Sequence, residues 1–289
     1  MIIYTNSSLS TFRDCPRKYR LAYNYRLRPT SMPDYVGIGS AYHIAHEYGE
    51  DGLDQASIDP FIREAARACY RGWTPRLVAE YVAIELRVQH DDFAGGIDAI
   101  VRLVDGRLAV LERKTTATLD DDYWRRVELD SQVSGYFWLA REAGHDVQTV
   151  VYDVVERPAF RQLKATLVKK YRKDGALYAN QREHDETPAE FFARCERRPE
   201  HYAMREVGIT TQRIVEWRYD VNEQRRAIET GFAYRNTAAC ARRGSVCEYL
   251  SICHRSDLHE NTPEGFVRVT DVHPELAREG QASQSGQNL

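Results

Sequence analysis

The spacing of apolar residues predicts a series of helices followed by a strand in the first third of the chain. In residues 8–25 the apolar residues recur at helical spacing, which is typical of a helix with one buried face. Residues 37–50 and 56–70 are expected to form two further helices. In residues 80–88 one set of alternate positions is mainly aliphatic and the other set is mixed in polarity, and this alternation indicates a strand. The chain therefore passes from helices into a sheet.

A β-hairpin is predicted a short distance after this strand. Residues 99–104 and 107–111 are rich in apolar and β-branched residues, and each segment has the length of a strand. The Asp105-Gly106 pair between them is the strongest short-range signal for a tight hairpin turn. The two segments are therefore expected to pair side by side.

This hairpin is expected to bring three charged side chains together. Glu112 and Lys114 directly follow the return strand, and residues two positions apart on a strand share one face. Asp98 precedes the first strand of the hairpin and so comes close to both. Two carboxylates beside an ammonium group can bind a divalent cation and position an attacking water. The alternative interpretation is a solvated strand end that carries a salt bridge.

The remaining pattern indicates an α/β protein. Residues 129–143 are expected to form a helix, and residues 147–155 form a strand rich in β-branched residues. A long helix is expected over residues 210–237, and Thr187-Pro188 is expected to start a shorter one. Helices, three strands, a helix and a strand in this order predict an α/β core with a central mixed sheet flanked by helices.

Composition narrows the classes of function. The 289 residues are 43% hydrophobic and 29% charged, which is ordinary for a globular protein. No apolar run is long enough to span a bilayer and no signal peptide is recognisable. We therefore expect a cytoplasmic protein of a bacterium, an archaeon or a virus-infected cell, without a membrane partner. The net charge of −3 gives no global basic field, so any nucleic-acid surface has to be local.

Basic residues are dense in residues 157–182. This segment is either a solvated insertion or an arm that contacts phosphates, with Lys169 and Lys170 as candidate contacts. Residues 183–190 are polar and resemble a linker, and residues 275–289 are expected to form a disordered tail.

The positions of four cysteines indicate a second site, separate from the charged residues of the hairpin. Cys240, Cys247 and Cys253 cluster near the C-terminus, and Cys15 lies far upstream. The other two cysteines lie in helical stretches and are most simply buried thiols. Three clustered cysteines in a cytoplasmic chain indicate a metal site more than disulfides. Four thiolates fit either zinc or an iron–sulfur cluster.

The charged residues of the hairpin resemble the motif of the PD-(D/E)XK nuclease superfamily. Gly96-Ile97-Asp98 stands in the place of its "PD", and Glu112-Arg113-Lys114 stands in the place of its "(D/E)XK". This resemblance implies a restriction-endonuclease-like core and an enzyme that hydrolyses phosphodiester bonds. It also implies that Asp98 and Glu112 bind Mg²⁺ or Mn²⁺, with the carbonyl of Arg113 as a further ligand. Lys114 would then position the hydrolytic water.

Two helical motifs resemble the RecB-like members of that superfamily. Residues 37–46 are similar to their G-x-x-x-H helix, in which His43 matches an additional metal ligand and His46 is a second candidate. An imidazole ligand shifts the preference of such a site toward manganese. Gln132 and Tyr136 form a Q-x-x-x-Y pair on one helix face. The resemblance implies that the glutamine orients water or the lysine and that the tyrosine contacts substrate, while ordinary helix packing is the alternative.

The cysteine arrangement resembles that of AddB-type helicase-nuclease subunits and of CRISPR-associated RecB-like exonucleases. In those proteins four cysteines hold a [4Fe-4S] cluster. The resemblance implies that Cys15, Cys240, Cys247 and Cys253 hold a cluster that ties the first helix to the C-terminal segment. The longer spacing between Cys240 and Cys247 departs from the best-known form, which leaves structural Zn²⁺ as the alternative. The basic residues nearest these cysteines are candidate contacts to DNA phosphates: Arg17, Lys18, Arg242 and Arg243.

Two structural parts and a tail are therefore expected. Residues 1–30 and 205–274 would form a helical cysteine-cluster region. Residues 31–204 would form the nuclease core, with the basic insertion near 157–182. Residues 275–289 would form the tail.

The expected function is a metal-dependent DNA nuclease with an iron–sulfur staple. The family resemblance implies an exonuclease that acts on single-stranded DNA or duplex ends and leaves 5′-phosphates, with Tyr136 and other aromatic residues as stacking surfaces. One alternative is a catalytically silent DNA-binding or scaffold subunit of a recombination complex. Another is a CRISPR adaptation nuclease that trims new spacers with integration proteins as partners.

Overall fold

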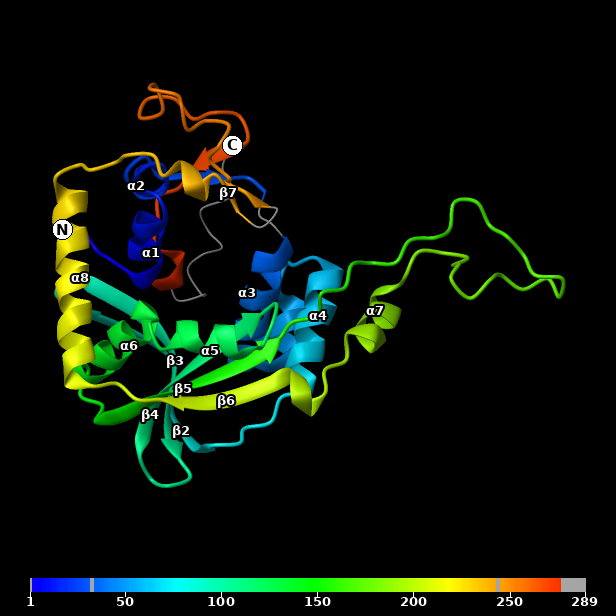
Figure 1. The fold of residues 1–289 in the computed structure, drawn as a ribbon, viewed down its shortest axis with the longest axis horizontal. Coiled ribbons are helices and arrows are strands. Elements are labelled where there is room, and N and C mark those ends of the chain that lie inside the picture. The colour runs from blue at the N-terminus through cyan, green and yellow to red at the C-terminus, as the bar shows by residue number, and fades with distance from the viewer. Residues whose placement is uncertain (1, 32–33, 243–244, 277–289) are drawn as a thin grey trace.

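A five-stranded mixed β-sheet lies at the centre of the computed structural model, which describes residues 2–31, 34–242 and 245–276 (Figure 1). The strand order is β2-β3-β4-β5-β6, in which β4 and β5 run parallel and the other neighbouring pairs run antiparallel. This architecture is the expected α/β core with a mixed sheet. The strands are β2 (Val78–His90), β3 (Phe93–Leu103), β4 (Leu108–Thr116), β5 (Val147–Glu156) and β6 (Tyr202–Val207).

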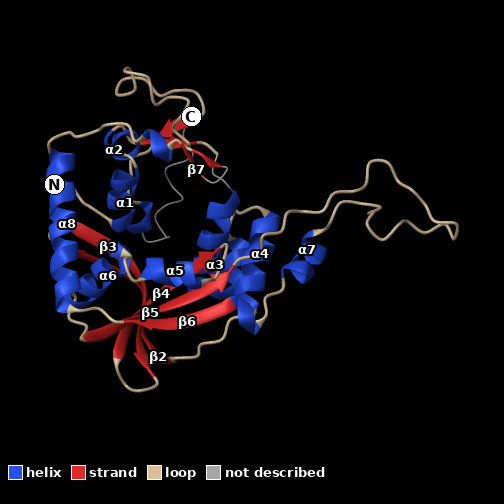
Figure 2. Ribbon diagram, in the orientation of Figure 1, coloured by secondary structure: helices blue, strands red, loops and turns tan. Residues whose placement is uncertain are grey.

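Several helices cover one face of this sheet and form the largest apolar core with it (Figure 2). On β4, Val110 belongs to this core, whereas Leu111 belongs to a separate cluster on the opposite face. Because strand residues alternate between faces, Glu112 and Lys114 share the helix-covered face with Val110. These helices include α1 (Asn6–Asp14), α5 (Asp121–Val127), α6 (Ser131–Glu142) and α8 (Thr211–Glu229).

A second helical group lies at the side of the sheet where β4 and β5 end (Figure 1). Its members pack against one another through small apolar clusters. The first helix of the group is broken at Gly49, whose φ of 72° is readily adopted only by glycine. The helices are α3 (Asp34–Gln55), α4 (Pro60–Arg71) and α7 (Pro188–Cys195).

The N- and C-terminal segments meet in a smaller apolar core. Leu21 and Leu27 pack there against Tyr249, Ile252 and Leu258. A two-stranded sheet and a short hairpin complete this region. Its elements are α2 (Pro16–Tyr19), a π-helical turn (Arg20–Asn24), β1 (Leu27–Pro29), β7 (Ala241–Arg242), β8 (Ser245–Val246) and β9 (Phe266–Arg268).

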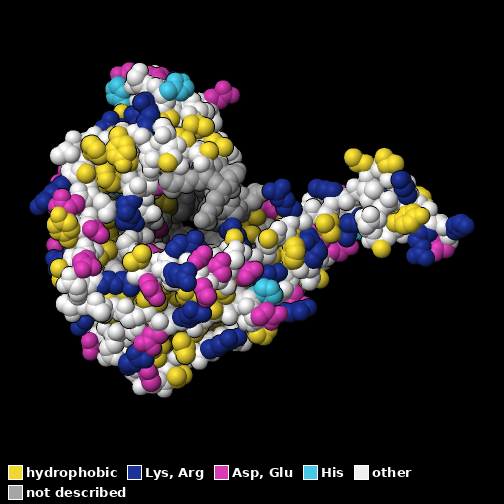
Figure 3. Space-filling view, viewed as in Figure 1, with side chains coloured by type: hydrophobic (Ala, Val, Ile, Leu, Met, Phe, Trp, Pro, Cys, Tyr) yellow, Lys and Arg dark blue, Asp and Glu magenta, His cyan; other side chains and the backbone are white. Residues whose placement is uncertain are grey.

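Residues 157–187, here called the arm, leave the end of β5 and extend away from the body of the protein (Figure 1). Backbone hydrogen bonds hold its two sides together, and they run from Thr166 N to Arg182 O, from Arg172 N to Ala176 O and from Glu186 N to Leu163 O. Apolar and basic side chains are mixed along it (Figure 3). Leu167 near its tip is fully exposed.

Most of the predicted elements are present, with corrected boundaries. The hairpin, the helix expected at 129–143 and the strand expected at 147–155 are confirmed as β3–β4, α6 and β5. The helix expected over 8–25 is interrupted at Cys15, which has an extended backbone. The helix expected to end at 237 ends eight residues earlier, at Glu229, and Gly231 with its φ of 73° follows it.

Several elements were not predicted, and part of the predicted tail can be described. Helix α5 (Asp121–Val127), strand β6 and three short 3₁₀ turns were missed. Glu275 belongs to one of these turns and accepts a hydrogen bond of 2.6 Å from Thr5 Oγ1. Residues 277–289 of the predicted tail lie outside the described residues. The 3₁₀ turns are Pro199–His201, Thr237–Ala239 and Pro274–Leu276.

Among the helices that the structure describes, none has the length and apolar character of a membrane-spanning segment.

Candidate active site

The register of the β3–β4 hairpin positions Asp98 and Glu112 next to each other. Ala99 pairs with Leu111, so the residues one step outward lie opposite each other and point to the same face. The backbone amide of Arg113 donates a hydrogen bond of 2.7 Å to Asp98 Oδ2. Both carboxylates are buried, Glu112 almost completely.

Helix α3 brings His43 to this pair. Its Nδ1 lies 3.3 Å from Asp98 Oδ1. The negative charge of Asp98 raises the pKa of His43 above its usual value. Burial alone would raise the pKa of Asp98, but His43 and the Arg113 amide outweigh it and hold this pKa at about 2. Asp98 is therefore ionised and accepts hydrogen bonds from two directions.

Glu85 on β2 is a residue of this site that the sequence prediction missed. Ligand atoms of His43, Glu85 and Asp98 all lie within 4.8 Å of one another. Glu85 faces Asp98 because Ile84 pairs with Ala99 and the next residues continue the register, and its φ of 49° marks a local distortion of the strand. An imidazole and two carboxylates form a donor set that suits Mn²⁺ or Mg²⁺. The sequence feature that could have identified Glu85 is its position as an acidic residue within the predicted strand that precedes the hairpin.

The buried Glu112 and the partly exposed Lys114 form an ion pair beside this donor set. Lys114 Nζ lies 2.5 Å from Glu112 Oε1. Burial, with a further contribution from Asp98, raises the pKa of Glu112 to about 7 although Lys114 opposes the shift. Among the described residues, Glu112 Oε2 is buried and has no hydrogen-bond partner. A cation at this position would satisfy that oxygen and offset the crowded negative charge, so the residues fit a divalent metal.

Helix α6 holds Lys114 from the other side. Lys114 Nζ donates a hydrogen bond of 2.7 Å to Gln132 Oε1, and Gln132 Nε2 donates one of 3.0 Å to the hydroxyl of Tyr136. The predicted Q-x-x-x-Y pair thus forms a chain of contacts that ends at the lysine. The ring of Tyr136 is buried and packs directly on Gly95, so in this conformation it is not a stacking surface for bases.

A cavity of about 410 Å³ gives access to Lys114. Residues of β4 form one wall, and helix α5 contributes Tyr123 and Arg126 to the other. Arg126 adds a second basic side chain to this cavity, and Asp130 adds an acidic one. An anionic substrate can therefore reach the lysine from this side.

Two residues of the predicted set point elsewhere. The side chain of Arg113 is buried on the opposite face of β4, where its Nη2 donates a hydrogen bond of 3.1 Å to the hydroxyl of Tyr81. The role of its carbonyl as a metal ligand stays a prediction. The imidazole of His46 packs edge-on against Tyr42, Tyr70 and Trp73, and burial lowers its pKa to about 2. His46 is therefore held among aromatic rings and is not one of the ligand atoms grouped with Glu85 and Asp98.

The cysteines predicted to form a second site lie around one small cavity. Cys15, Cys240, Cys247 and Cys253 line it together with Lys18. The backbone amide of Asn236 points at Cys15 Sγ over 3.4 Å, a contact that stabilises a thiolate. Among the described residues, no three cysteine sulfurs lie within 4.8 Å of one another. Tetrahedral zinc, with bonds of about 2.3 Å, would require sulfurs roughly 3.8 Å apart.

The candidate DNA contacts differ in how their charges are used. Arg17 donates a hydrogen bond of 2.8 Å to the carbonyl of Arg255, and Lys18 lies 3.0 Å from Glu248. Lys169 pairs with Glu183 at 2.8 Å, whereas Lys170 is exposed on the arm. Only the backbone of Arg242 is described, and Arg243 lies outside the described residues.

Comparison with known proteins adds independent findings. The sequence pattern of the PD-(D/E)XK nuclease superfamily matches residues 4–254, a range that contains every candidate from Cys15 to Cys253. Among solved structures, the crystal structure of a phage-related exonuclease from Haemophilus somnus 129PT is similar to this chain, with a TM-score of 0.36 and 14% sequence identity. That similarity covers 80% of this chain and 94% of the exonuclease. No curated protein sequence matches the chain.

Proposed function

The chain belongs to the PD-(D/E)XK nuclease superfamily, and on this premise we propose that it is a metal-dependent deoxyribonuclease. One observation carries the proposal. Glu112 has a buried carboxylate oxygen that finds no partner within the described part of the chain, and it lies beside an ionised aspartate, a histidine and a lysine. A divalent cation is the partner that such a group of acceptors requires.

Each side chain has a role in the proposed reaction. His43, Glu85, Asp98 and Glu112 would hold Mg²⁺ or Mn²⁺, and such an ion would supply Lewis-acid activation of water and positive charge to offset the phosphodiester. The hydrogen bond from the Arg113 amide keeps Asp98 in place. Lys114 orients the attacking water and donates a hydrogen bond to the oxygens that gain charge in the transition state. Its contact with Gln132 fixes the ammonium group for this task.

The substrate and mode of cleavage follow from the RecB-like resemblance. We infer an exonuclease that acts on single-stranded DNA or duplex ends and leaves 5′-phosphates. The exposed basic side chains of the arm, such as Lys170, support a role in contacting the DNA backbone.

We further propose that an iron–sulfur cluster, as the cysteine resemblance implies, is the structural staple of the terminal segments. Four cysteines converge there, and an amide points at one of the sulfurs. Their spacing is wider than a single zinc ion needs, whereas a cluster places several iron and sulfide atoms between the thiolates. Zinc is the alternative that metal determination on anaerobically purified protein would reveal.

The decisive experiment is cleavage of end-labelled single-stranded and duplex DNA by the wild type and by Glu112→Gln. Wild-type protein should cut in Mn²⁺ and stop on addition of chelator, and the variant should lose at least about 1000-fold in rate. Its fold should be retained, because burial already favours an uncharged side chain at this position. Glu206→Gln, the same change on β6 where the carboxylate pairs with Arg107, is the matched control and should cut normally.

A different result would point to another class of function. If the wild type binds DNA but does not cleave it in the presence of any divalent metal tested, the chain is better described as a silent DNA-binding or scaffold subunit. The product length and the labelled end that disappears first would distinguish exonuclease from endonuclease activity.

A further inference from the structure

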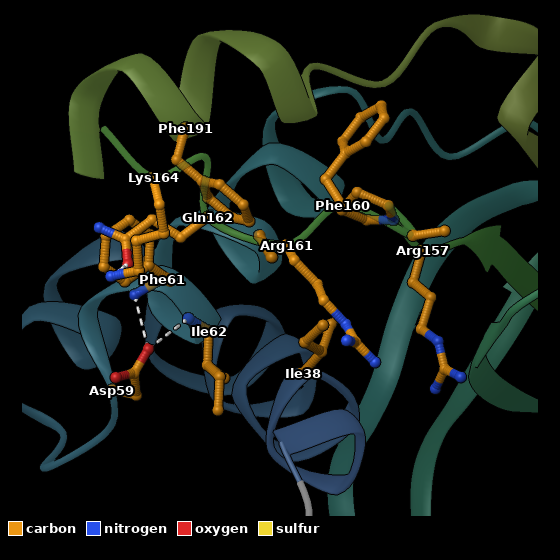
Figure 4. Close-up of a pocket in the computed structure, with 13 residues that line it drawn as sticks. Ile38, Asp59, Phe61, Ile62, Arg157, Phe160, Arg161, Gln162, Lys164 and Phe191 are labelled. Carbon is orange, nitrogen blue, oxygen red and sulfur yellow. Dashed lines mark hydrogen bonds between the residues drawn. The ribbon is translucent and has the colours of Figure 1, made fainter. Parts of the chain in front are cut away.

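A larger cavity lies outside the group of candidate catalytic residues. It has a volume of about 730 Å³ and is enclosed by helices α3, α4 and α7 and by the first residues of the arm (Figure 4). This volume falls in the range that binds small organic ligands and exceeds what a single inorganic ion fills. The function derived above leaves this cavity without a role.

The walls of the cavity combine positive charge with apolar surface. Arg157, Arg161 and Lys164 contribute cations from the arm. Phe61 and Phe191 contribute aromatic rings that meet edge to face at 5.3 Å. Ligands that carry both a negative charge and a flat apolar surface match such walls.

Arg161 is the cation of the cavity that is available to a ligand. Among the described residues its guanidinium group makes no hydrogen bond and no ion pair. Figure 4 shows it extending beside Ile38, with the guanidinium group of Arg157 on the same side. Lys164, in contrast, is already paired with Asp185 at 3.0 Å. The carboxylate of Asp59 accepts the amides of the first turn of α4 and so is occupied as its cap.

The cavity adjoins the end of the strand that carries the candidate active site. The amide of Arg157 donates a hydrogen bond of 2.8 Å to the carbonyl of Thr116. Thr116 lies two residues after Lys114, a separation of roughly 7 Å along a strand. Lys114 and Thr116 both line the smaller cavity at the catalytic lysine. The two cavities therefore flank one strand end.

We propose that the larger cavity binds a nucleotide of the DNA strand whose phosphodiester lies at Lys114. Its phosphate contacts Arg161 and Arg157, and its base packs on Phe61 and the neighbouring apolar wall. This inference rests on the proposed nuclease function. It assigns the arm a further task, because the first residues of the arm complete a binding site next to the reaction centre.

Binding without cleavage tests the inference. The probe is fluorescein-labelled oligodeoxythymidine, and anisotropy is measured in EDTA so that no metal supports hydrolysis. Arg161→Glu should raise the dissociation constant at least about tenfold, the loss expected for one charge-assisted contact. It should also reduce the slope of log Kd against log salt by about one or more. Arg226→Glu on α8, an equal charge reversal at an exposed position far from the cavity, should change Kd less than twofold.

A second variant fills the cavity and leaves its charges in place. Ala159 lines the cavity and is exposed, so Ala159→Trp can occupy the space without opening the core. It should weaken oligonucleotide binding as well. Equal affinities of the wild type and both cavity variants, or a wild type that binds no oligonucleotide, would overturn the inference. Because binding is measured without metal, a protein that binds through Arg161 but never cleaves would contradict only the nuclease proposal.

Discussion

Glu85 and Asp98 place carboxylate oxygens within 4.8 Å of each other across the β2–β3 hairpin. Burial and the nearby charge of Asp98 raise the pKa of Glu85, although the hydrogen bond from Arg87 opposes the shift. Two carboxylates held this close are unfavourable unless a cation or proton separates them. Their position beside His43 therefore adds Glu85 to the residues proposed to hold the metal.

Glu85→Gln should weaken metal binding while leaving the fold intact. The amide keeps the size of the side chain but removes one of the charges that face the cation. We expect the Mn²⁺ concentration for half-maximal cleavage to rise at least about tenfold, with little loss of rate at saturating metal. Glu80→Gln is the control, because Glu80 lies on the same strand and pairs with Arg102 at the surface. Equal metal dependence of the two variants would remove Glu85 from the site.

Gln132→Ala should reduce the turnover number and leave the Michaelis constant for DNA nearly unchanged. Gln132 joins the ammonium group of Lys114 to the hydroxyl of Tyr136, so its loss frees the lysine to move. Misplacement of a reacting group by about 1 Å can cost up to about 100-fold in rate. Tyr136→Phe, which removes only the hydroxyl, should show a smaller loss of the same kind. Gln212→Ala on α8, where the amide donates a hydrogen bond to the nearby Glu216, should behave like the wild type. An increase in the Michaelis constant alone would indicate substrate binding and contradict this role.

The parts of the site that lie close together in the sequence were predictable. The Asp105-Gly106 turn sets the β3–β4 register, and this register alone brings Asp98 opposite Glu112. The helical spacing of Gln132 and Tyr136 likewise puts both on one face of α6. Glu85 was not predictable in this way, because its place depends on the pairing of β2 with β3 and on a local distortion of the strand.

The structural features that the sequence pattern did not predict depend on contacts between residues far apart in the chain. Strand β6 is short and carries charged residues such as Arg205 and Glu206, so its alternation is weak, and only pairing with β5 makes it a strand. Cys15 interrupts the first helix with an extended backbone, which no local signal except the following proline indicates. The larger cavity was not predictable, because its walls come from three helices in separate parts of the chain and from the arm.

Cys247→Ser should destabilise the protein and remove any visible absorption of an iron–sulfur cluster. A cluster held by the four cysteines would tie Cys15 to a segment more than 200 residues later, and cross-linking so long a loop stabilises by about 5 kcal/mol in a chain-entropy model. Thermal unfolding and the absorption spectrum of anaerobically purified protein measure both effects. Cys195→Ser is the matched control, because Cys195 is a buried thiol of α7 outside the cysteine cavity, and it should keep the colour. A colourless wild type that contains zinc would favour the alternative metal.

The raised pKa of Asp153 on β5 should make the stability of the protein depend on pH. It is buried beneath the site, where Trp73 Nε1 donates a hydrogen bond of 2.5 Å to it, and burial raises its pKa from 3.8 to about 6. The folded protein therefore holds this proton to a higher pH than the unfolded chain does. The contribution of Asp153 to stability falls as the pH rises from about 4 to about 6 and stays at its lower level above that range.

Asp153→Asn should therefore stabilise the protein at neutral pH. The amide resembles the protonated acid and can still accept the hydrogen bond from Trp73. The free energy of unfolding of the variant should match the wild type near pH 4 and exceed it above pH 6, by at most about 3 kcal/mol. Denaturant titrations at several pH values measure this difference, and Asp146→Asn at an exposed position should show none. Because Arg113 lies buried nearby and lowers this pKa, the opposite result is also informative. A variant that is less stable at pH 8 would mean that the ionised aspartate serves chiefly as the counter-charge of Arg113.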